Sequence, residues 1–192
     1  FNNAKMMGGY GDGGAIVTNL DVVNQRSILF KNHWNMPQLS VDSKDYPTPE
    51  KVEWGYKSRL DNIQAAVLAI KLKHLPDMIY RRYHIAHRYL EGLVGIEGIV
   101  LPQDQEGRVW QEFHLRVHRR KAFVASMKES GVETLVRDET PNHKLEGLGL
   151  EHFHLPITEQ LAREIVRIPL YPEMTDEEVE HVIKAVLVAS IA

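Results

Sequence analysis

The chain has 192 residues, of which 43% are hydrophobic and 26% are charged, and its formal net charge is -3. This composition supports one medium domain or two small ones with a packed core and excludes a disordered protein. The weak negative charge gives no general attraction to nucleic acid or to anionic membranes, and the absence of cysteine excludes disulfides and thiolate metal sites. No apolar run approaches the length of a membrane span, so we expect a cytoplasmic protein that binds neither membranes nor nucleic acid.

The first segment carries a single lysine, Lys5, ahead of five glycines between residues 8 and 14 and the strand-like run 15–18. A lysine amine attacks carbonyls to form a Schiff base when its surroundings favour the neutral form, and glycines let the backbone pass close to a bulky cofactor. The glycines precede a strand instead of opening a helix, so the segment is neither a Walker loop nor a dinucleotide fingerprint. On this pattern alone, a plain surface loop remains the alternative. Because the chain starts at Phe1 without an initiator methionine, we expect it to be a piece of a longer polypeptide.

Two helices are predicted next, separated by a long irregular segment. Asn19 is a candidate N-cap for a helix that ends near Lys31, and residues 32–53 contain three prolines among polar residues, which is typical of a functional loop or a surface insert. Ser58 and Asp61 have the spacing of a capping box, and apolar residues recur at helical intervals from there to residue 93. Pro76 either begins a second helix or kinks a continuous one.

A basic run in the second half of this helical segment predicts a solvated face rather than a nucleic-acid site, because no second basic stretch or aromatic platform accompanies it. The run consists of Arg81, Arg82, His84, His87 and Arg88.

After glycines 95 and 98 the pattern changes, which indicates a domain boundary near the end of the long helix. We predict strands at 109–117 and 132–136, helices at 119–130 and 158–167, and a last helix that begins with a capping box at Thr175. This order of elements predicts a small α/β or α+β layer. His152 and His154 are interpreted as surface or interface residues, and no metal site is expected, because no third ligand accompanies them.

Several motifs in order resemble the DegT/DnrJ/EryC1/StrS family of sugar aminotransferases, which are fold type I pyridoxal-phosphate (PLP) enzymes. The motifs are Phe-x-x-x-Lys ending at Lys5, the glycine-rich segment 11–19, Asn-His at 32–33, Gly-Tyr-Lys-Ser-Arg-Leu-Asp-Asn-Ile-Gln-Ala-Ala at 55–66, and segments 161–164 and 168–175. The resemblance implies an α/β fold. Residues 1–90 would form the C-terminal part of the PLP-binding large domain with its long linking helix, and residues 91–192 a small α+β C-terminal domain.

The resemblance also implies an activity and a partner. Lys5 would form the Schiff base with pyridoxal 5'-phosphate, and the enzyme would move an amino group from glutamate to a nucleotide-linked keto sugar. Lys57, which stands where the family has asparagine, would bind the cofactor phosphate of the partner subunit in a homodimer with shared sites. Arg59 of the same segment is a candidate for substrate binding.

Two departures from the family pattern affect the expected substrate pocket. Trp110 and Gln111 replace a Tyr-His pair, and Arg137 begins a segment that replaces His-Tyr-Pro, whereas His143 matches the histidine that follows. Arg137 and His143 are therefore candidates for substrate binding, and the identity of the sugar and of the aminated carbon stays open. In the family, the residues that contact the cofactor ring lie upstream of Phe1, so this chain is expected to hold part of an active site.

Two alternatives remain from the sequence. One is a related PLP enzyme that makes an aromatic amine precursor with the same lysine. The other is a non-catalytic helical fragment that binds a partner through its basic run, which would leave Lys5 and the glycines unexplained. Family members that dehydrate their sugar replace the lysine, and the presence of Lys5 argues against that reaction.

Overall fold

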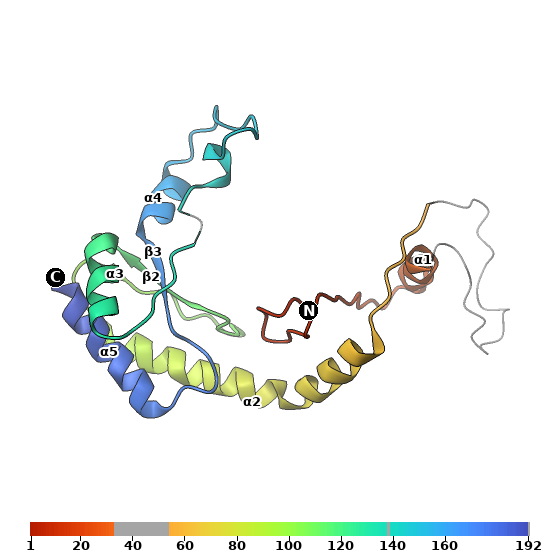
Figure 1. Ribbon diagram of the computed structural model, residues 1–192, viewed down its shortest axis with the longest axis horizontal. Coiled ribbons are helices and arrows are strands. Elements are labelled where there is room, and N and C mark those ends of the chain that lie inside the picture. The colour runs from red at the N-terminus through yellow and green to blue at the C-terminus, as the bar shows by residue number, and fades with distance from the viewer. Residues whose placement is uncertain (33–53, 138, 192) are drawn as a thin grey trace. The chain divides into compact units, whose positions relative to one another are not determined.

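The computed structural model describes residues 1–32, 54–137 and 139–191, and the chain forms two compact units, Phe1–Leu75 and Pro76–Ala192 (Figure 1). The predicted division by function, into a cofactor-binding portion at 1–90 and a small domain at 91–192, stays a prediction. The segment 33–53, with His33 of the Asn-His motif, lies outside the described residues, as does Asp138.

The first unit contains α1 (Asp21–Lys31) and the N-terminal part of α2 (Asn62–Gly92). The strand predicted at 15–18 was wrong: Ile16 and Val17 are 72% and 94% exposed, and no strand among the described residues pairs with them. A strand is stabilised only by a neighbouring ladder, so apolar residues alone do not form one. The helix predicted from Asn19 starts later, and the backbone amide of Leu20 donates to Thr18 Oγ1 at 3.0 Å.

The long helix α2 runs without interruption through Pro76, so the predicted second helix was wrong, and the predicted kink of a continuous helix stays a prediction. The capping box predicted at Ser58 and Asp61 was wrong, because the helix begins only at Asn62. The Ser58 amide donates to the Lys31 carbonyl at 3.2 Å, so this residue lies in an extended segment instead of a helical turn.

The second unit is built on a three-stranded antiparallel sheet in the order β1-β2-β3, formed by Ile99–Val100, Phe113–Val117 and Ile165–Ile168. Side chains of β2 alternate: Phe113, Leu115 and Val117 are buried, and the two residues between them are partly exposed. This period of two gives the sheet one apolar face and one polar face.

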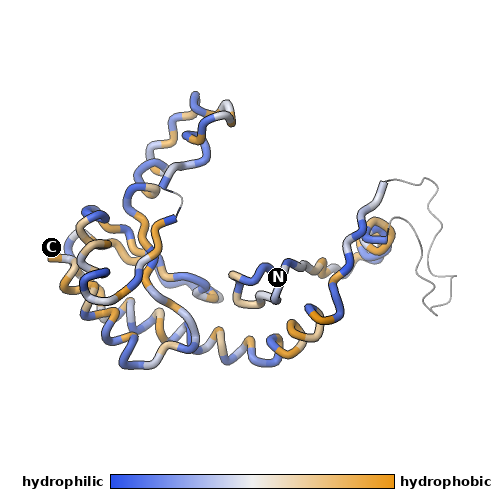
Figure 2. Tube along the Cα trace, viewed as in Figure 1, coloured by the Kyte–Doolittle hydropathy of each residue, from blue (hydrophilic) through white to orange (hydrophobic). Residues whose placement is uncertain are grey.

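Three helices cover the apolar face, namely the C-terminal part of α2, α3 (Arg120–Glu129) and α5 (Asp176–Ser190). Tyr89 of α2, Phe123 of α3 and Val186 of α5 are at most 1% exposed in this core. The hydrophobic stretches of the strands and of α5 can be followed in Figure 2. The capping box predicted at Thr175 is confirmed, with both of its reciprocal hydrogen bonds to Glu178.

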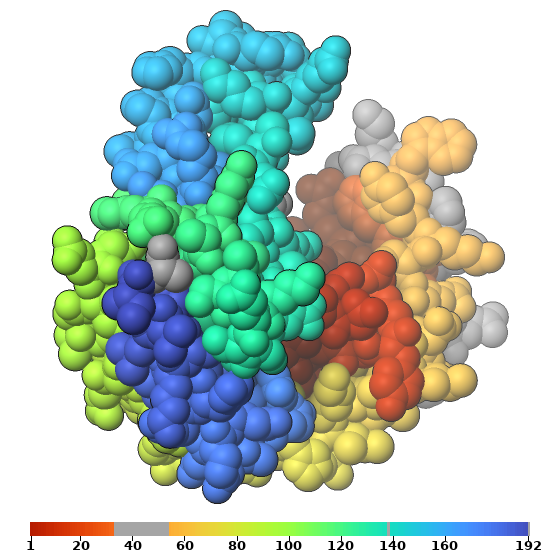
Figure 3. Space-filling view, turned by 60° about the vertical axis from the view of Figure 1, so that its left-hand side comes forward, coloured from red at the N-terminus to blue at the C-terminus, as the bar shows by residue number. Residues whose placement is uncertain are grey.

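A short 3-10 helix, η1 (Asn142–Lys144), and α4 (Pro156–Glu164) form an arm, residues 142–164, that stands out from the body of the second unit (Figure 3). Arg120 anchors its base by donating to the carbonyl of Ala162 at 2.6 Å. Arg116 binds Glu164 through both Nε and Nη2, at 3.0 and 2.8 Å.

Three predicted boundaries in the second unit were wrong. The helix predicted at 158–167 ends at Glu164, because the β-branched residues that follow form β3 ahead of Pro169, which disfavours helical geometry at Ile168. The strand predicted at 132–136 is reduced to a single bridge between Leu135 and Arg167, and the strand predicted from 109 begins at Phe113. The two-residue strand β1 was not predicted.

The sequence predicted a solvated face for the basic run of α2, and this prediction was wrong for its three arginines. Arg82 donates to three carbonyls, those of Gln111 and Leu170 at 2.9 Å and that of Trp110 at 3.4 Å. Arg81 and Arg88 pair with Asp176 at the start of α5, at 2.9 and 3.4 Å. Burial lowers the pKa of the Arg82 guanidinium. These arginines therefore hold α2 to the loops and to the last helix.

Candidate functional site

Lys5 lies in a tight loop at the start of the first unit. Its backbone amide donates to the Asn2 carbonyl at 3.0 Å, and its own carbonyl accepts from the Gly8 amide at 2.8 Å. The side chain is exposed, and within the described residues its ammonium group has no hydrogen bond or ion pair. The loop thus fixes the main chain on both sides of Lys5 and leaves the amine accessible.

The glycines allow this loop to fold back on itself. A Cβ atom on Gly8 would lie 2.5 Å from the Asn3 carbonyl oxygen, and one on Gly9 would lie 2.5 Å from Gln64 Oε1. The backbone cannot yield to so close an approach, so glycine is required at residue 8, whereas a side chain at residue 9 would displace Gln64. Gly8 and Gly9 thus permit close contacts within the chain itself, and the predicted close approach of the backbone to a cofactor stays a prediction.

Helix α2 holds the same loop through two polar side chains. Gln64 Oε1 accepts from the Tyr10 amide at 2.8 Å, and Lys71 Nζ donates to the Gly8 carbonyl at 2.6 Å. The sequence motif at 55–66 contains Gln64 without indicating a role for it, and Lys71 was not predicted. No sequence signal separates Lys71 from the other lysines of the helix, because the partner is a backbone carbonyl 63 positions away.

Lys57 is exposed, and its backbone forms an antiparallel bridge with Asn32 at the end of α1. The Tyr56 amide, next to it, donates to the Phe30 carbonyl at 2.7 Å. Asn32 is 9% exposed and its side-chain amide donates to the Ile28 carbonyl at 2.9 Å. Arg59 is also exposed and borders an open hollow that residues 60–64 complete. The segment that carries both cations is therefore anchored by its main chain while its side chains face outward.

The other two predicted residues belong to the second unit. Arg137 is exposed, two residues beyond the bridge that attaches Leu135 to β3. His143 is 5% exposed, and its Nε2 lies 3.1 Å from Glu159 Oε1, which joins η1 to α4. This hydrogen bond, with a smaller contribution from Lys144, lowers the pKa of the Glu159 carboxyl. His143 thus anchors the arm, whereas Arg137 presents an exposed guanidinium.

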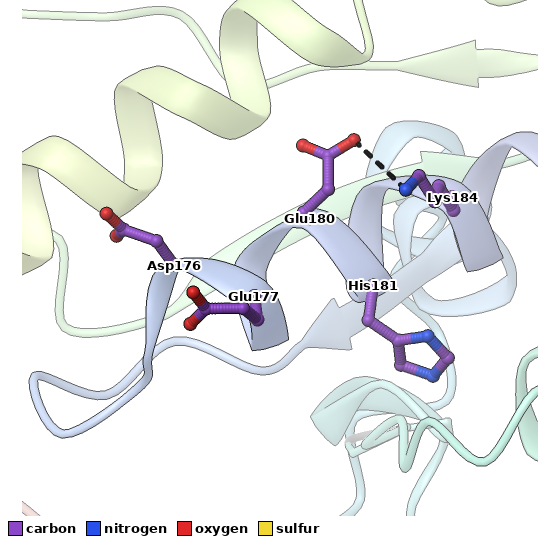
Figure 4. A pocket seen from close by; sticks show the side chains of 5 residues that line it. All are labelled: Asp176, Glu177, Glu180, His181 and Lys184. Atoms are coloured by element: carbon purple, nitrogen blue, oxygen red, sulfur yellow. Dashed lines mark ion pairs between the residues drawn. The ribbon is translucent and has the colours of Figure 1, made fainter.

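An acidic hollow on α5 gives no sign of a ligand site. It is lined by Asp176, Glu177, Glu180, His181 and Lys184, which Figure 4 shows along one stretch of the helix. Most of its charged groups have partners within the second unit: Arg81 and Arg88 pair with Asp176, Arg88 and Lys184 pair with Glu180, and His181 contacts the Ser130 carbonyl. In the described parts of the chain there is no group of three or more potential metal ligands, and His152 and His154 are exposed. None of the described helices combines the length and apolar character that crossing a membrane requires.

Residues 1–187 match the DegT/DnrJ/EryC1/StrS aminotransferase family. One relative, the dTDP-3-amino-3,6-dideoxy-alpha-D-galactopyranose transaminase of Aneurinibacillus thermoaerophilus, is 38% identical over 91% of this chain and 46% of its own length. Another, the erythromycin biosynthesis sensory transduction protein EryC1 of Saccharopolyspora erythraea, is 33% identical over 95% of this chain and 49% of its own length. The chain thus spans about half the length of the curated relatives it matches.

Solved structures agree with this match in fold. DesV of Streptomyces venezuelae, solved with a ketimine intermediate, has a TM-score of 0.84 and 32% identity over 98% of this chain and 50% of its own. NtdA of Bacillus subtilis, solved with bound cofactor PMP, has a TM-score of 0.86 and 26% identity over the whole of this chain and 45% of its own. The predicted fold class, part of a PLP-dependent transferase with mixed helix and sheet, is confirmed. The chain belongs to the DegT/DnrJ/EryC1/StrS aminotransferase family.

Proposed function

We propose that the protein is a PLP-dependent aminotransferase that moves an amino group from glutamate to a nucleotide-linked keto sugar. The observation that carries the proposal is the exposed amine of Lys5 on a loop whose main chain is fixed by hydrogen bonds on both sides. Family membership supports it, as do relatives named as dTDP-sugar and UDP-sugar aminotransferases. A cytoplasmic location stays a prediction.

The residues present fit the cofactor. A primary amine that has no competing partner among the described residues is the group that an aldehyde requires, and the exposed cations Lys57 and Arg59 suit a phosphate. When bound, PLP supplies an electron-withdrawing ring that stabilises a carbanion at the amino-bearing carbon. Lys5 would hold the cofactor covalently and, once released, would accept and return the proton at that carbon.

The proposed assembly is a homodimer in which the segment 55–59 completes the phosphate site of the second subunit. Its support is the anchoring of this segment through Tyr56 and Ser58 to the last turn of α1, while Lys57 and Arg59 face outward. The aromatic side chains of this region are also uncovered, with Trp54 and Tyr56 at 93% and 71% exposure. Exposed aromatic surface of this kind marks interaction sites.

For substrate recognition, Arg137 is the proposed contact and His143 the anchor of the neighbouring arm. A guanidinium offers a planar fork of donors that matches a diphosphate or a carboxylate. His143 would act on the substrate through the loop that it fixes by binding Glu159. The rival hypothesis, a fragment that binds a partner through its basic run, loses its basis because Arg81, Arg82 and Arg88 are bound within the chain's own second unit.

The test of the proposed function is the position of the cofactor. Borohydride reduction of the cofactor-loaded full-length protein, followed by peptide mapping, should place the pyridoxyl mass on Lys5. Modification of Lys31 or Lys44 instead, or of no lysine, would overturn the assignment.

Sharing of the site is tested by mixing two inactive variants, Lys5→Ala and Lys57→Glu, of the full-length protein. Hybrid dimers contain one site with both wild-type residues, so part of the activity should return. Subunit exchange is verified independently by mass, and a mixture that exchanges without regaining activity contradicts a shared site.

A further inference from the structure

Helix α2 holds the Lys5 loop at two points that lie on one helix face. Gln64 and Lys71 are seven residues apart, which is close to two helical turns and about 10 Å along the axis. They bind Tyr10 and Gly8, two residues apart in the loop, through the Tyr10 amide and the Gly8 carbonyl. One acceptor and one charged donor therefore fix the main chain just beyond Lys5.

The hydrogen bond from Lys71 to Gly8 is linked to Lys5 through Gly8 alone. The Gly8 carbonyl accepts from Lys71 at 2.6 Å, and the Gly8 amide donates to the Lys5 carbonyl at 2.8 Å. Gly8 is buried, and a Cβ atom there would strike the backbone of Asn3. The two peptide groups that flank Gly8 are therefore each held by one of these hydrogen bonds.

Gln64 likewise packs closely against the loop around Tyr10. Gln64 is partly buried, and its side chain packs so tightly on the loop that a Cβ on Gly9 would lie 2.5 Å from Oε1 and one on Gly11 would lie 3.4 Å from Nε2. Movement of Gln64 would release the Tyr10 amide, while the bonds of Asn2 to Asp12 and of Phe1 to Gly13 would remain. Lys73, two residues after Lys71, is by contrast exposed and has no hydrogen bond or ion pair among the described residues.

We infer that Gln64 and Lys71 are positioning residues that fix the loop from which Lys5 presents its amine. The inference rests on the proposed function of Lys5. Both half-reactions use the same amine, so a displaced loop slows both steps alike and leaves the KM for the sugar nucleotide nearly unchanged. A misplacement of about 1 Å at a reacting group costs up to roughly a hundredfold in rate.

The two hydrogen bonds that join Gln64 and Lys71 to the loop, here called the clamp, are tested first without cofactor. The measurement is hydrogen exchange of the loop amides in the full-length protein. Gln64→Ala should speed exchange of the Tyr10 amide by roughly threefold to tenfold, the scale of one hydrogen bond. Gln64→Glu keeps an acceptor oxygen and should restore most of the protection. Lys71→Met keeps the stem without donors and should speed exchange of the Gly8 amide, whereas Lys73→Met should not. Unchanged exchange in Gln64→Ala and Lys71→Met would overturn the clamp.

The effect on chemistry is tested by single-turnover measurement of each half-reaction. Lys71→Met and Gln64→Ala should slow both by roughly tenfold to a hundredfold. Lys71→Arg, which donates to the same carbonyl, should recover most of the rate, and Lys73→Met should match the wild type. After reduction, the pyridoxyl mass should remain on Lys5 in all variants. A loss confined to the sugar half-reaction, or rates equal to those of Lys73→Met, would overturn the positioning role.

The two proposals fail separately. If the wild-type protein carries no pyridoxyl group on Lys5, the proposed function is wrong, while the exchange measurement still decides whether the clamp exists. If Lys5 is modified but the half-reaction rates do not change when Gln64 or Lys71 is replaced, only the positioning role is wrong.

Discussion

The two compact units differ in how many of their apolar residues they bury. Every member of the main hydrophobic core lies between Ile85 and Ala189, in the second unit, whereas Leu29 and Leu68 are the buried apolar residues of the described part of the first. Large apolar side chains of the first unit are exposed, among them Val17 at 94% and Ile63 at 75%. Since apolar burial is the main stabilising term in folding, the second unit carries its own stability, and the first is held mainly by polar and backbone contacts.

The strongest way to break this comparison is to remove a ring from the core. Phe113 is fully buried, and its ring centroid lies 5.1 Å from that of Tyr89 and 5.4 Å from that of Trp110. Phe113→Ala should lower the free energy of unfolding by about 3–5 kcal/mol, measured by urea denaturation. Ile63→Ala in the first unit should change it by less than about 0.5 kcal/mol. Equal losses would show that both units share one stabilising core.

The next largest loss of stability is expected from Arg82, which binds α2 to the loops of the second unit. Arg82→Ala leaves the carbonyls of Trp110, Gln111 and Leu170 without their shared donor and should cost about 3 kcal/mol in the same assay. Trp110 has a positive φ of 47°, a strained conformation that this donor helps to hold. Arg88→Ala, which removes the more exposed ion pairs with Asp176 and Glu180, should cost less than about 1 kcal/mol. Arg82→Lys should not rescue, because one ammonium group lacks the planar fork. An unchanged free energy of unfolding in Arg82→Ala would mean that the loops are held by packing alone.

A third change separates the units by function. Arg137→Ala in the second unit should weaken use of the sugar nucleotide by roughly 1.5 to 3 kcal/mol, the scale of a charged hydrogen bond, and leave the glutamate half-reaction nearly unchanged. Lys71→Met in the first unit should affect both half-reactions. Steady-state and single-turnover rates for each half-reaction make the distinction. Equal loss in both half-reactions for Arg137→Ala would indicate a structural role. No loss in either would show that Arg137 is a solvent-exposed residue that does not bind the substrate.

The smallest expected effect is a pH dependence at the base of the arm. Hydrogen bonds from Gln160 and then from Arg116 lower the pKa of the Glu164 carboxyl in the folded protein. Its contribution to stability is therefore present above the ordinary glutamate pKa near 4.5 and is lost as the pH falls through the lowered folded value. Urea midpoints should fall less steeply with acid in Glu164→Gln than in the wild type. Identical acid profiles would show that the ion pair contributes nothing measurable.

The amino-acid sequence by itself determined the features that depend on neighbours along the chain. Helical periodicity predicted α2 and α5, the capping box at Thr175 was correct, and the ordered motifs around Lys5 and Lys57 were sufficient to indicate the family. The helices and the cap are local signals, because a helix closes its hydrogen bonds within four residues and a cap within three.

Tertiary structure decided what depends on partners far away in the chain. Residues 165–168 continue a helical pattern in sequence, yet they pair with β2, about fifty positions earlier, and form a strand. Arg82 belongs to a run that looks solvated, but its guanidinium finds three carbonyls 28 to 88 positions away. Gln64 and Lys71 gain their roles in the same way from the Lys5 loop. Long polar side chains and strand edges can bind any free backbone group, so only the folded chain selects which one they meet.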